Sequence, residues 1–300
     1  MSIQLTPAAA VAETHPPESA TLSVRPLPRL RIQATPGWKA LNLRELWQFR
    51  ELLWFLALRD IKVRYKQTLL GVAWAVLQPL MAMLLFSVFF GRLGGFDQKT
   101  ADVPYPVFVL CGLVPWQLFS YALTQASNSV VAEQRLLTKV YFPRLLIPIS
   151  PILSGVVDFG ISMVLLAGLM AYYRVLPGGA VLALPFFMLF AVLAALAVGL
   201  WLSAVNAIYR DVRYTIPFLI QFWLFATPIA YPSSIVPPRW QWVYGLNPMV
   251  GVVEGFRWSL IGGGQPPWPA VVASFLVVLA LLVSGLYYFR RMEKTFADVV

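Results

Sequence analysis

The 300-residue sequence contains one cysteine and one histidine, and this scarcity excludes several kinds of site. A single thiol, Cys111, cannot form a disulfide within the chain. Because Cys111 lies in an apolar run, we expect it to be a small packing residue. His15 falls in a proline-rich segment near the N-terminus. The rest of the chain has no histidine for a metal site or a Ser-His-Asp triad, so we predict no metal and no catalytic residues.

A nucleotide-binding loop is also missing. The sequence has no Gly-x-x-x-x-Gly-Lys-Ser/Thr motif and no Gly-Lys dipeptide. The loop and lysine that hold ATP phosphates in Walker-type proteins are therefore absent. We expect this chain to bind no nucleotide cofactor.

Charged residues are scarce, at 12% of the chain, whereas apolar residues make up 59% and the mean hydropathy is +0.71. Soluble domains are usually about 45–50% apolar. A net charge of +10 is compatible with nucleic acid binding. However, the positive residues fall where membrane topology and anionic headgroups favour them. We therefore expect contacts with membrane lipids and none with nucleic acid.

Six apolar stretches are long enough to cross a bilayer, since about 20 apolar residues span the hydrocarbon core as a helix. We predict an all-α integral membrane protein with spans at Leu69–Phe90, Tyr105–Ser129, Ile147–Tyr173, Ala180–Val205, Thr215–Pro232 and Ala270–Phe289. The even number of spans places both termini on the same side.

Lys and Arg gather in alternate loops, and this asymmetry predicts the orientation. The richer set comprises Arg59, Lys62, Arg64, Lys66, Arg135, Lys139, Arg144, Arg210, Arg213, Arg290, Arg291 and Lys294. The poorer set comprises Arg92, Lys99, Arg174, Arg239 and Arg257. The richer set is predicted to be cytoplasmic, so both termini face the cytoplasm of a bacterium and the chain is a multi-pass protein of its inner membrane.

The chain divides into four predicted parts. Residues 1–40 are rich in proline and lack a core, which is typical of a flexible cytoplasmic tail. Residues 41–67 carry a polar helical stripe that Phe55 interrupts, with large apolar residues elsewhere on the helical wheel, so we predict an amphipathic interface helix in the headgroup plane. It acts either as an anchor or as a moving lever. Residues 68–291 hold the six spans, and residues 292–300 form a cytoplasmic C-terminal tail.

Two connecting segments have unusual sequences. The charged loop Val131–Arg144 fits a short cytoplasmic helix, and its alternative is a solvated connector. The segment Tyr231–Pro269 has an apolar middle, Met249–Ile261, that is too short to span the membrane. We predict two re-entrant helices broken near Gly245–Pro248, because irregular backbone at membrane depth must be buried in protein or face water. The alternative is a loop at headgroup level with tryptophan anchors.

Ionisable and aromatic residues within the spans are the candidates for a transport path. Asp158 is the clearest charged residue inside a span. A charge there is costly, so Asp158 either lines a pore or pairs helices, or else it lies near the headgroups and hydrogen-bonds a neighbour. Aromatic residues either pack helices or line a conduit on which sugar rings stack. The channel candidates are Trp116, Phe119, Tyr121, Asp158 and Trp223.

Several blocks of sequence together resemble one family. RDIKVRYKQTLLGVAWAVLQPLMAMLLFSVFFGRL (Arg59–Leu93) is similar to the start of polysaccharide-export ABC transporter permeases of the ABC-2 class. KVYFPR (Lys139–Arg144), YRDVRYTIPFLIQFWLFATPIAYP (Tyr209–Pro232) and LNPMVGVVEGFR (Leu246–Arg257) resemble later blocks in the same order. The long proline-rich tail departs from the usual short start of the family.

The resemblance implies a homodimer of this chain with two separate ATPase subunits, which would bind ATP and Mg²⁺. It implies export of a polysaccharide on undecaprenyl diphosphate, such as O-antigen. It places the ATPase contact on Glu133, Arg135, Lys139, Tyr141, Phe142 and Arg144, and the outer gate on Asn247, Pro248, Glu254 and Arg257. Arg59, Lys62, Arg64 and Lys66 are candidates for the lipid diphosphate, because cationic donors pair with phosphate oxygens.

The rival interpretation is a membrane-embedded glycosyl- or phosphotransferase acting on lipid-linked sugars. Such chemistry normally needs carboxylates near a membrane face, often with a divalent metal. The acids predicted to be cytoplasmic are scattered and mostly adjacent to basic residues. This pattern favours the transport subunit over the enzyme.

Overall fold

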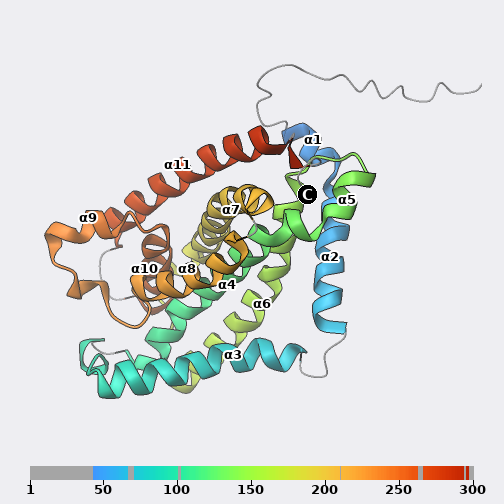
Figure 1. The fold of residues 1–300 in the computed structure, drawn as a ribbon. Helices are drawn as coiled ribbons and strands as arrows, with labels where there is room; N and C mark the ends of the chain where they lie inside the picture. The colour runs from blue at the N-terminus through green and yellow to red at the C-terminus, as the bar shows by residue number, and fades with distance from the viewer. Residues whose placement is uncertain are drawn as a thin grey trace, which may run out of the picture. The chain divides into compact units, whose positions relative to one another are not determined.

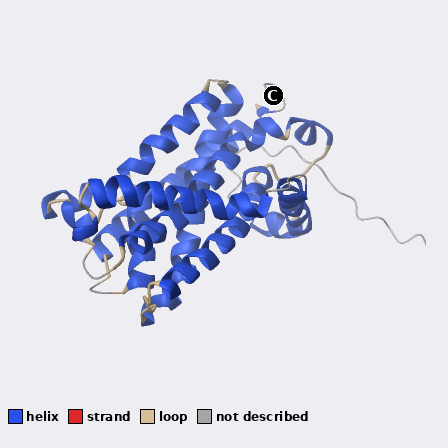
Figure 2. Cartoon of the chain, turned by 90° about the horizontal axis from the view of Figure 1, so that it is seen from below, coloured by secondary structure: helices blue, strands red, loops and turns tan. Residues whose placement is uncertain are grey.

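The computed structural model describes residues 43–66, 71–100, 103–209, 211–262, 266–293 and 295–296. All regular elements in these ranges are helical (Figure 2). The predicted tail 1–40 and residues 297–300 lie outside the described residues. So do Arg210 and Lys294 and both ends of the predicted interface helix, at 41–42 and 67.

Five helices in the described ranges are long and apolar enough to cross a membrane. Helices are expected there, because each backbone polar group in lipid needs a partner within the protein. The first is α3 (Gly71–Phe86), which continues into a π-helix, η1 (Ser87–Leu93). The others are α4 (Tyr105–Ala132), α6 (Leu146–Tyr172), α7 (Leu184–Ile208), which follows the 3₁₀ turn η3 (Gly179–Ala183), and α11 (Trp268–Glu293).

The predicted fifth span is shorter than expected. Its helix, α8 (Val212–Ala226), has 15 residues and ends six residues before the predicted boundary at Pro232. Thr227 adopts an extended conformation because Pro228 disfavours the helical region for the residue before it. Fifteen residues rise about 22 Å, less than the roughly 30 Å hydrocarbon core. The described chain therefore has five long helices and one short apolar helix in place of six full spans.

The segment after α8 contains a broken helical hairpin. Two 3₁₀ turns, η4 (Ser233–Ile235) and η5 (Pro238–Trp240), lead into the four-residue α9 (Gln241–Tyr244) and then α10 (Pro248–Ile261). The break between α9 and α10 coincides with the break predicted near Gly245–Pro248. The first arm is mostly turns, however, because three prolines between Tyr231 and Arg239 interrupt helical hydrogen bonding.

The predicted interface helix consists of α1 (Leu43–Gln48) and α2 (Arg50–Lys66). Backbone hydrogen bonds from Phe49 to Glu45 and from Leu53 to Phe49 bridge the two, so the helical path is nearly continuous. Leu56 and Ala57 are buried, while the large apolar residues Trp47, Trp54, Phe55 and Val63 are exposed.

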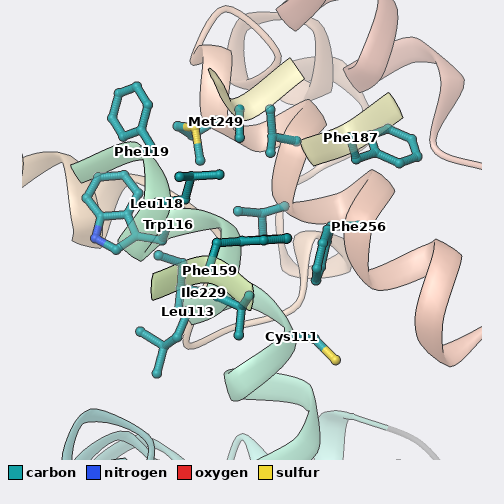
Figure 3. Packing of buried hydrophobic residues seen from close by; sticks show 14 of the residues in the cluster. Cys111, Leu113, Trp116, Leu118, Phe119, Phe159, Phe187, Ile229, Met249 and Phe256 are labelled. Carbon is teal, nitrogen blue, oxygen red and sulfur yellow. The ribbon is translucent and has the colours of Figure 1, made fainter. Parts of the chain in front are cut away.

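Helix α4 lies at the centre of the packed bundle, against α6, α7 and α10 (Figures 1 and 3). Small residues allow this close approach, as is usual where lipid supplies no hydrophobic driving force between helices. A Cβ on Gly199 of α7 would lie 2.9 Å from the Cβ of Ala126 on α4. Cys111 is fully buried in the same core, which matches the packing role predicted for it.

A second apolar cluster joins one end of the bundle to the neighbouring short helices. It contains Val130, Leu137, Phe142, Leu145, Leu146, Ile147, Leu200, Ala204, Ala207, Phe289 and Phe296. Leu46, Phe49, Leu52 and Leu53 from α1 and α2 pack against it. This end cluster therefore ties α1, α2 and α5 (Gln134–Lys139) to the ends of α6, α7 and α11 (Figure 1).

Candidate functional sites

Helix α5 is short and partly exposed, as the sequence of Val131–Arg144 predicts. The six residues assigned to ATPase contact divide into two groups. Arg135, Lys139 and Tyr141 are exposed. Phe142 is buried in the end cluster, Arg144 donates a hydrogen bond to the carbonyl oxygen of Glu293, and Glu133 pairs with Arg59. The first group forms a surface, and the second fixes α5 to the bundle.

Arg59 and Glu133 join α2 to the junction of α4 and α5. The Arg59 Nη2–Glu133 Oε1 distance is 2.5 Å and the Nη1–Oε2 distance is 3.2 Å, so the pair is bidentate. Asp60 also accepts a hydrogen bond from Arg59 Nη2, at 2.9 Å. The hydrogen bond to Glu133 is the main reason why the pKa of Arg59 lies above its ordinary value.

Asp158 joins α6 to α2. It is the thirteenth of 27 residues in α6, near the middle of a predicted span. Its Oδ2 lies 2.6 Å from Nη2 of Arg64, and its Oδ1 accepts a hydrogen bond from the Tyr65 hydroxyl. Burial, followed by the bond to Asp158, raises the pKa of Tyr65. The costly carboxylate is thus compensated by one cation and one hydroxyl from the same helix.

The ring of Tyr121 is held between two neighbours. The Arg64 guanidinium carbon lies 4.2 Å from the ring centre. A Cβ on Gly155 of α6 would come within 2.7 Å of Tyr121 Cδ1, so the glycine lets the ring approach closely. The Tyr121 hydroxyl lies 2.9 Å from Oγ of Ser154. The ring therefore packs within this chain, and its hydroxyl is within hydrogen-bonding distance of Ser154 and Gln125.

These groups border a cleft between α2, α4 and α6. Its volume is about 610 Å³, within the range of roughly 300–1,000 Å³ typical of small-molecule sites. We call it the α2–α4–α6 cleft, and it is lined by Arg59, Asp60, Val63, Arg64, Tyr121, Gln125, Asn128, Ser129, Ala132, Glu133, Ile147, Ser150 and Pro151. Lys62 and Lys66, the other two candidates for diphosphate, are exposed and do not line it.

The remaining channel candidates pack against each other. Trp116 and Phe119 are buried in α4, with ring centres 5.4 Å apart (Figure 3). Phe119 meets Trp223 of α8 edge to face at 5.2 Å. The indole Nε1 of Trp223 donates to Oδ1 of Asn247 at 2.7 Å. A chain of contacts therefore leads from the core of α4 through α8 to the break before α10.

Asn247 and Pro248 form the start of α10. Asn247 Oδ1 accepts from the backbone N–H of Met249 at 3.0 Å, which is the N-cap arrangement that satisfies a free helix-end donor. Its Nδ2 donates to Oγ1 of Thr227 at 3.1 Å. Pro248 occupies the first turn, where a missing N–H is harmless. Asn247 thus fixes both the helix start and the end of α8.

Glu254 and Arg257 form the ion pair that their spacing predicts. Arg257 Nη1 lies 2.9 Å from Glu254 Oε1, and the Arg257 residue is only 7% exposed. Its Nη2 donates to the carbonyl oxygen of Pro228 at 2.9 Å. The guanidinium carbon lies 3.7 Å from the centre of the Phe108 ring. Arg257 therefore connects α10, α4 and the extended segment after α8.

Some residues of these sites carried no signal in the sequence. Tyr65, Phe108 and Ser274 meet their partners only through tertiary folding, and no spacing rule links positions so far apart. Ser274 Oγ donates toward the Gly245 and Asn247 carbonyl oxygens at 2.9 Å each and accepts from Gly251 N–H at 3.0 Å. A serine within the apolar run of α11 was the one available hint of this polar bridge.

The architecture defines a class. Five membrane-length helices, a short sixth apolar helix and a broken hairpin before the last helix describe a polytopic α-helical membrane protein. Among the described residues, no three His, Cys, Asp or Glu side chains lie close enough together to hold a metal.

Comparison with known proteins gives the family. The sequence pattern of the ABC-2 type transporter family matches residues 51–261, which is most of the chain. The chain belongs to this family of membrane subunits, so it is a multi-pass inner-membrane transport component and not an enzyme, and the ATPase is a separate subunit. These findings do not favour the glycosyl- or phosphotransferase interpretation.

The similarity to three relatives extends over most of each relative's length. The chain is 29% identical to the O-antigen export system permease protein RfbA of Myxococcus xanthus, over 86% of this chain and 98% of the relative. It is 26% identical to an RfbA protein of Klebsiella pneumoniae, over 83% and 95%. It is 26% identical to the polysialic acid transport protein KpsM of Escherichia coli, over 80% and 92%.

Proposed function

We propose that this chain is the membrane-spanning permease subunit of an ABC transporter that exports a polysaccharide such as O-antigen across the inner membrane. The observation that carries this proposal is the nearly end-to-end similarity to permeases named for O-antigen and polysialic acid transport. Two copies of the chain form the path, and two ATPase subunits supply ATP binding, Mg²⁺ and hydrolysis. The distribution of Lys and Arg supports placing both termini in the cytoplasm.

The exposed residues of α5 form the ATPase contact in this proposal. Arg135 and Lys139 are exposed on α5 and Tyr141 just after it, and Phe142 and Arg144 fasten this segment to the bundle. A push on α5 is passed to α2 through the Glu133–Arg59 pair. This linkage supports the lever interpretation of the interface helix, and it is compatible with an additional anchoring role for its exposed aromatic residues.

The cargo is a polysaccharide on undecaprenyl diphosphate in this proposal. Lys62 and Lys66 lie one helical turn apart on α2 and are exposed, so their ammonium groups suit the phosphates of a diphosphate. Arg59 and Arg64 already pair with Glu133 and Asp158. A diphosphate would reach these arginines only by displacing a carboxylate, and the two lysines are therefore the stronger candidates.

Residues 231–269 shape the outer exit in this proposal, dipping into the bilayer as a re-entrant element. The support is the burial of α10 against α4, α7 and α11, together with the Glu254–Arg257 pair inside it. In a Cys111→Ser background, cysteines placed between Val250 and Ser259 should react slowly with membrane-impermeant thiol reagents. Rapid, uniform labelling from the periplasmic side would show an exposed loop and remove the re-entrant element from the proposal.

Deletion of the gene tests the function itself. Cells lacking this chain should lose the surface polysaccharide and accumulate lipid-linked polymer on the cytoplasmic side, and the wild-type gene should restore export. A deletion strain with unchanged surface polysaccharide and no internal polymer would contradict the proposed function.

A further inference from the structure

We propose that the α2–α4–α6 cleft is a sugar-binding site, which holds a neutral part of the exported polysaccharide by hydrogen bonds before it enters the transport path. The inference rests on the proposed function and adds a location and a mode of recognition to it. Three properties of the cleft support the inference. They are its balanced charges, its hydrogen-bonding groups, and the packing of other residues of the chain against the ring of Tyr121.

The charges of the cleft are already matched. Arg59 is held by Glu133 and Asp60, and Arg64 is held by Asp158. Each guanidinium thus faces at least one carboxylate at 2.5 to 2.9 Å. An anionic ligand would compete with these carboxylates and be repelled by them, whereas a neutral ligand would meet no such penalty. The balance therefore favours an uncharged partner.

The free hydrogen-bonding capacity of the cleft suits a polyol. Gln125 is exposed in the cleft, and within the described part of the chain its amide makes a single 3.5 Å contact, with the Tyr121 hydroxyl. Asn128, also in the lining, already donates to the Thr124 carbonyl oxygen at 2.8 Å and accepts from Asn206 at 3.2 Å, so Gln125 supplies most of the capacity that a ligand can use. An amide both donates and accepts, so it matches neighbouring sugar hydroxyls, which also do both.

The mode of binding is hydrogen bonding along the cleft wall, not stacking on an aromatic face. Arg64 covers the Tyr121 ring at 4.2 Å, and the ring also packs closely against Gly155. The Tyr121 hydroxyl, which lies 2.9 Å from Ser154 Oγ, can share a further hydrogen bond with a ligand because a hydroxyl both donates and accepts. The cleft lies beside the α4–α5 junction, and Glu133 is part of its wall. A sugar bound there would therefore touch the Arg59–Glu133 pair that links α2 to α5.

Photocrosslinking in cells tests the site directly. A benzophenone amino acid is placed at Gln125 and, as a matched control, at Gln117, a glutamine on the same helix that does not line the cleft. Both strains are the gene deletion carrying the variant, and each must restore export. After irradiation, glycan on the purified permease is detected by periodate oxidation and hydrazide labelling. We expect labelling at position 125 to exceed that at position 117 severalfold.

Mild acid then separates sugar from lipid as the crosslinked group, because it cleaves the bond between a sugar and a diphosphate. Label that survives acid shows attachment to the sugar, as the proposal requires. Label that disappears shows attachment to the diphosphate or its lipid and overturns the proposal. Equal label at 117, or none at 125 in a strain that exports normally, overturns it as well while leaving the proposed function intact.

A second measurement does not depend on the bulky probe. Gln125→Leu should lower the export rate about three- to tenfold through lost hydrogen bonds, while the permease remains at its normal level in the membrane. Gln117→Leu should stay within about twofold of wild type. Equal export by Gln125→Leu and wild type would contradict the assignment.

Discussion

The guanidinium of Arg257 is placed directly over the ring of Phe108, with its central carbon 3.7 Å from the ring centre. The same group pairs with Glu254 and donates to the carbonyl oxygens of Pro228 and Ile229. One side chain therefore joins α10, α4 and the segment that ends α8. Because Arg257 is only 7% exposed, removing any partner leaves its charge poorly compensated.

Glu254→Ala should destabilise the protein because it leaves the buried Arg257 without its carboxylate. A loss of about 3–5 kcal/mol is typical when one partner of a buried pair is removed. The effect is measured as the midpoint of thermal unfolding in detergent, with the loss of monodisperse protein as the readout. Glu51→Ala, a change at an exposed acid on α2, serves as the control and should leave the midpoint nearly unchanged. Equal midpoints for the two variants would show that the pair is dispensable.

Gly255→Ala should be far more harmful than Gly168→Ala. A Cβ at Gly255 would lie 1.9 Å from Cε1 of Phe187, whereas a Cβ at Gly168 meets nothing within 4 Å. Overpacking of this kind costs about 1–3 kcal/mol or more, since α7 or the Phe187 ring must shift. The membrane expression level and the thermal stability of the two alanine variants are compared. Normal stability for Gly255→Ala would mean that α7 and α10 do not pack as described.

Cysteines at Lys139 and Tyr141 should crosslink to the ATPase subunit in a Cys111→Ser background. Both positions are exposed at or just beyond α5, and Tyr141 is 68% exposed. Leu182, in the turn before α7, is 91% exposed and provides a control that should give no crosslink. Crosslinking is read as a shifted band that contains both proteins. Failure at both α5 positions with a functional transporter would remove α5 from the interface.

The purified chain alone should hydrolyse no ATP, and activity should appear only when the ATPase subunit is added. The reason is the absence of a Gly-Lys phosphate loop from the sequence. Phosphate release is measured with the permease in nanodiscs, with and without the partner. Turnover by the permease alone, after contaminating ATPases have been excluded with a mock purification, would contradict this prediction.

Local rules predicted the local features well. The i,i+3 spacing of Glu254 and Arg257 predicts their ion pair, and the break predicted near Gly245–Pro248 coincides with the gap between α9 and α10. Hydropathy located five long helices, because each needs only a continuous apolar run. The predicted end of the fifth span, Pro232, lies six residues beyond the end of α8. The apolar residues continue to that point, but Pro228 disfavours a helical conformation at Thr227 and so ends the helix earlier.

Contacts between side chains on different helices could not be predicted from local sequence spacing. Arg59 and Arg64 were predicted as partners for phosphate, and nothing in the sequence linked them to Glu133 and Asp158. Tyr121 was chosen as a channel aromatic from its type alone, although Arg64 and Gly155 occupy its ring. Which charge neutralises which depends on how α2 packs on α6, and a helical wheel contains no such information.

The short length of α8 affects the membrane around it. Its neighbours α4 and α7 have 28 and 25 residues, whereas α8 has 15. If α8 crosses the bilayer, as its apolar sequence predicts, the bilayer beside it is expected to thin or to admit headgroups and water, because the helix falls about 8 Å short of a normal hydrocarbon core. A polar headgroup that crosses beside α8 travels through less hydrocarbon than it would elsewhere around the protein. We therefore expect the bilayer beside α8 to oppose the passage of a lipid headgroup less than the bilayer beside the long helices does.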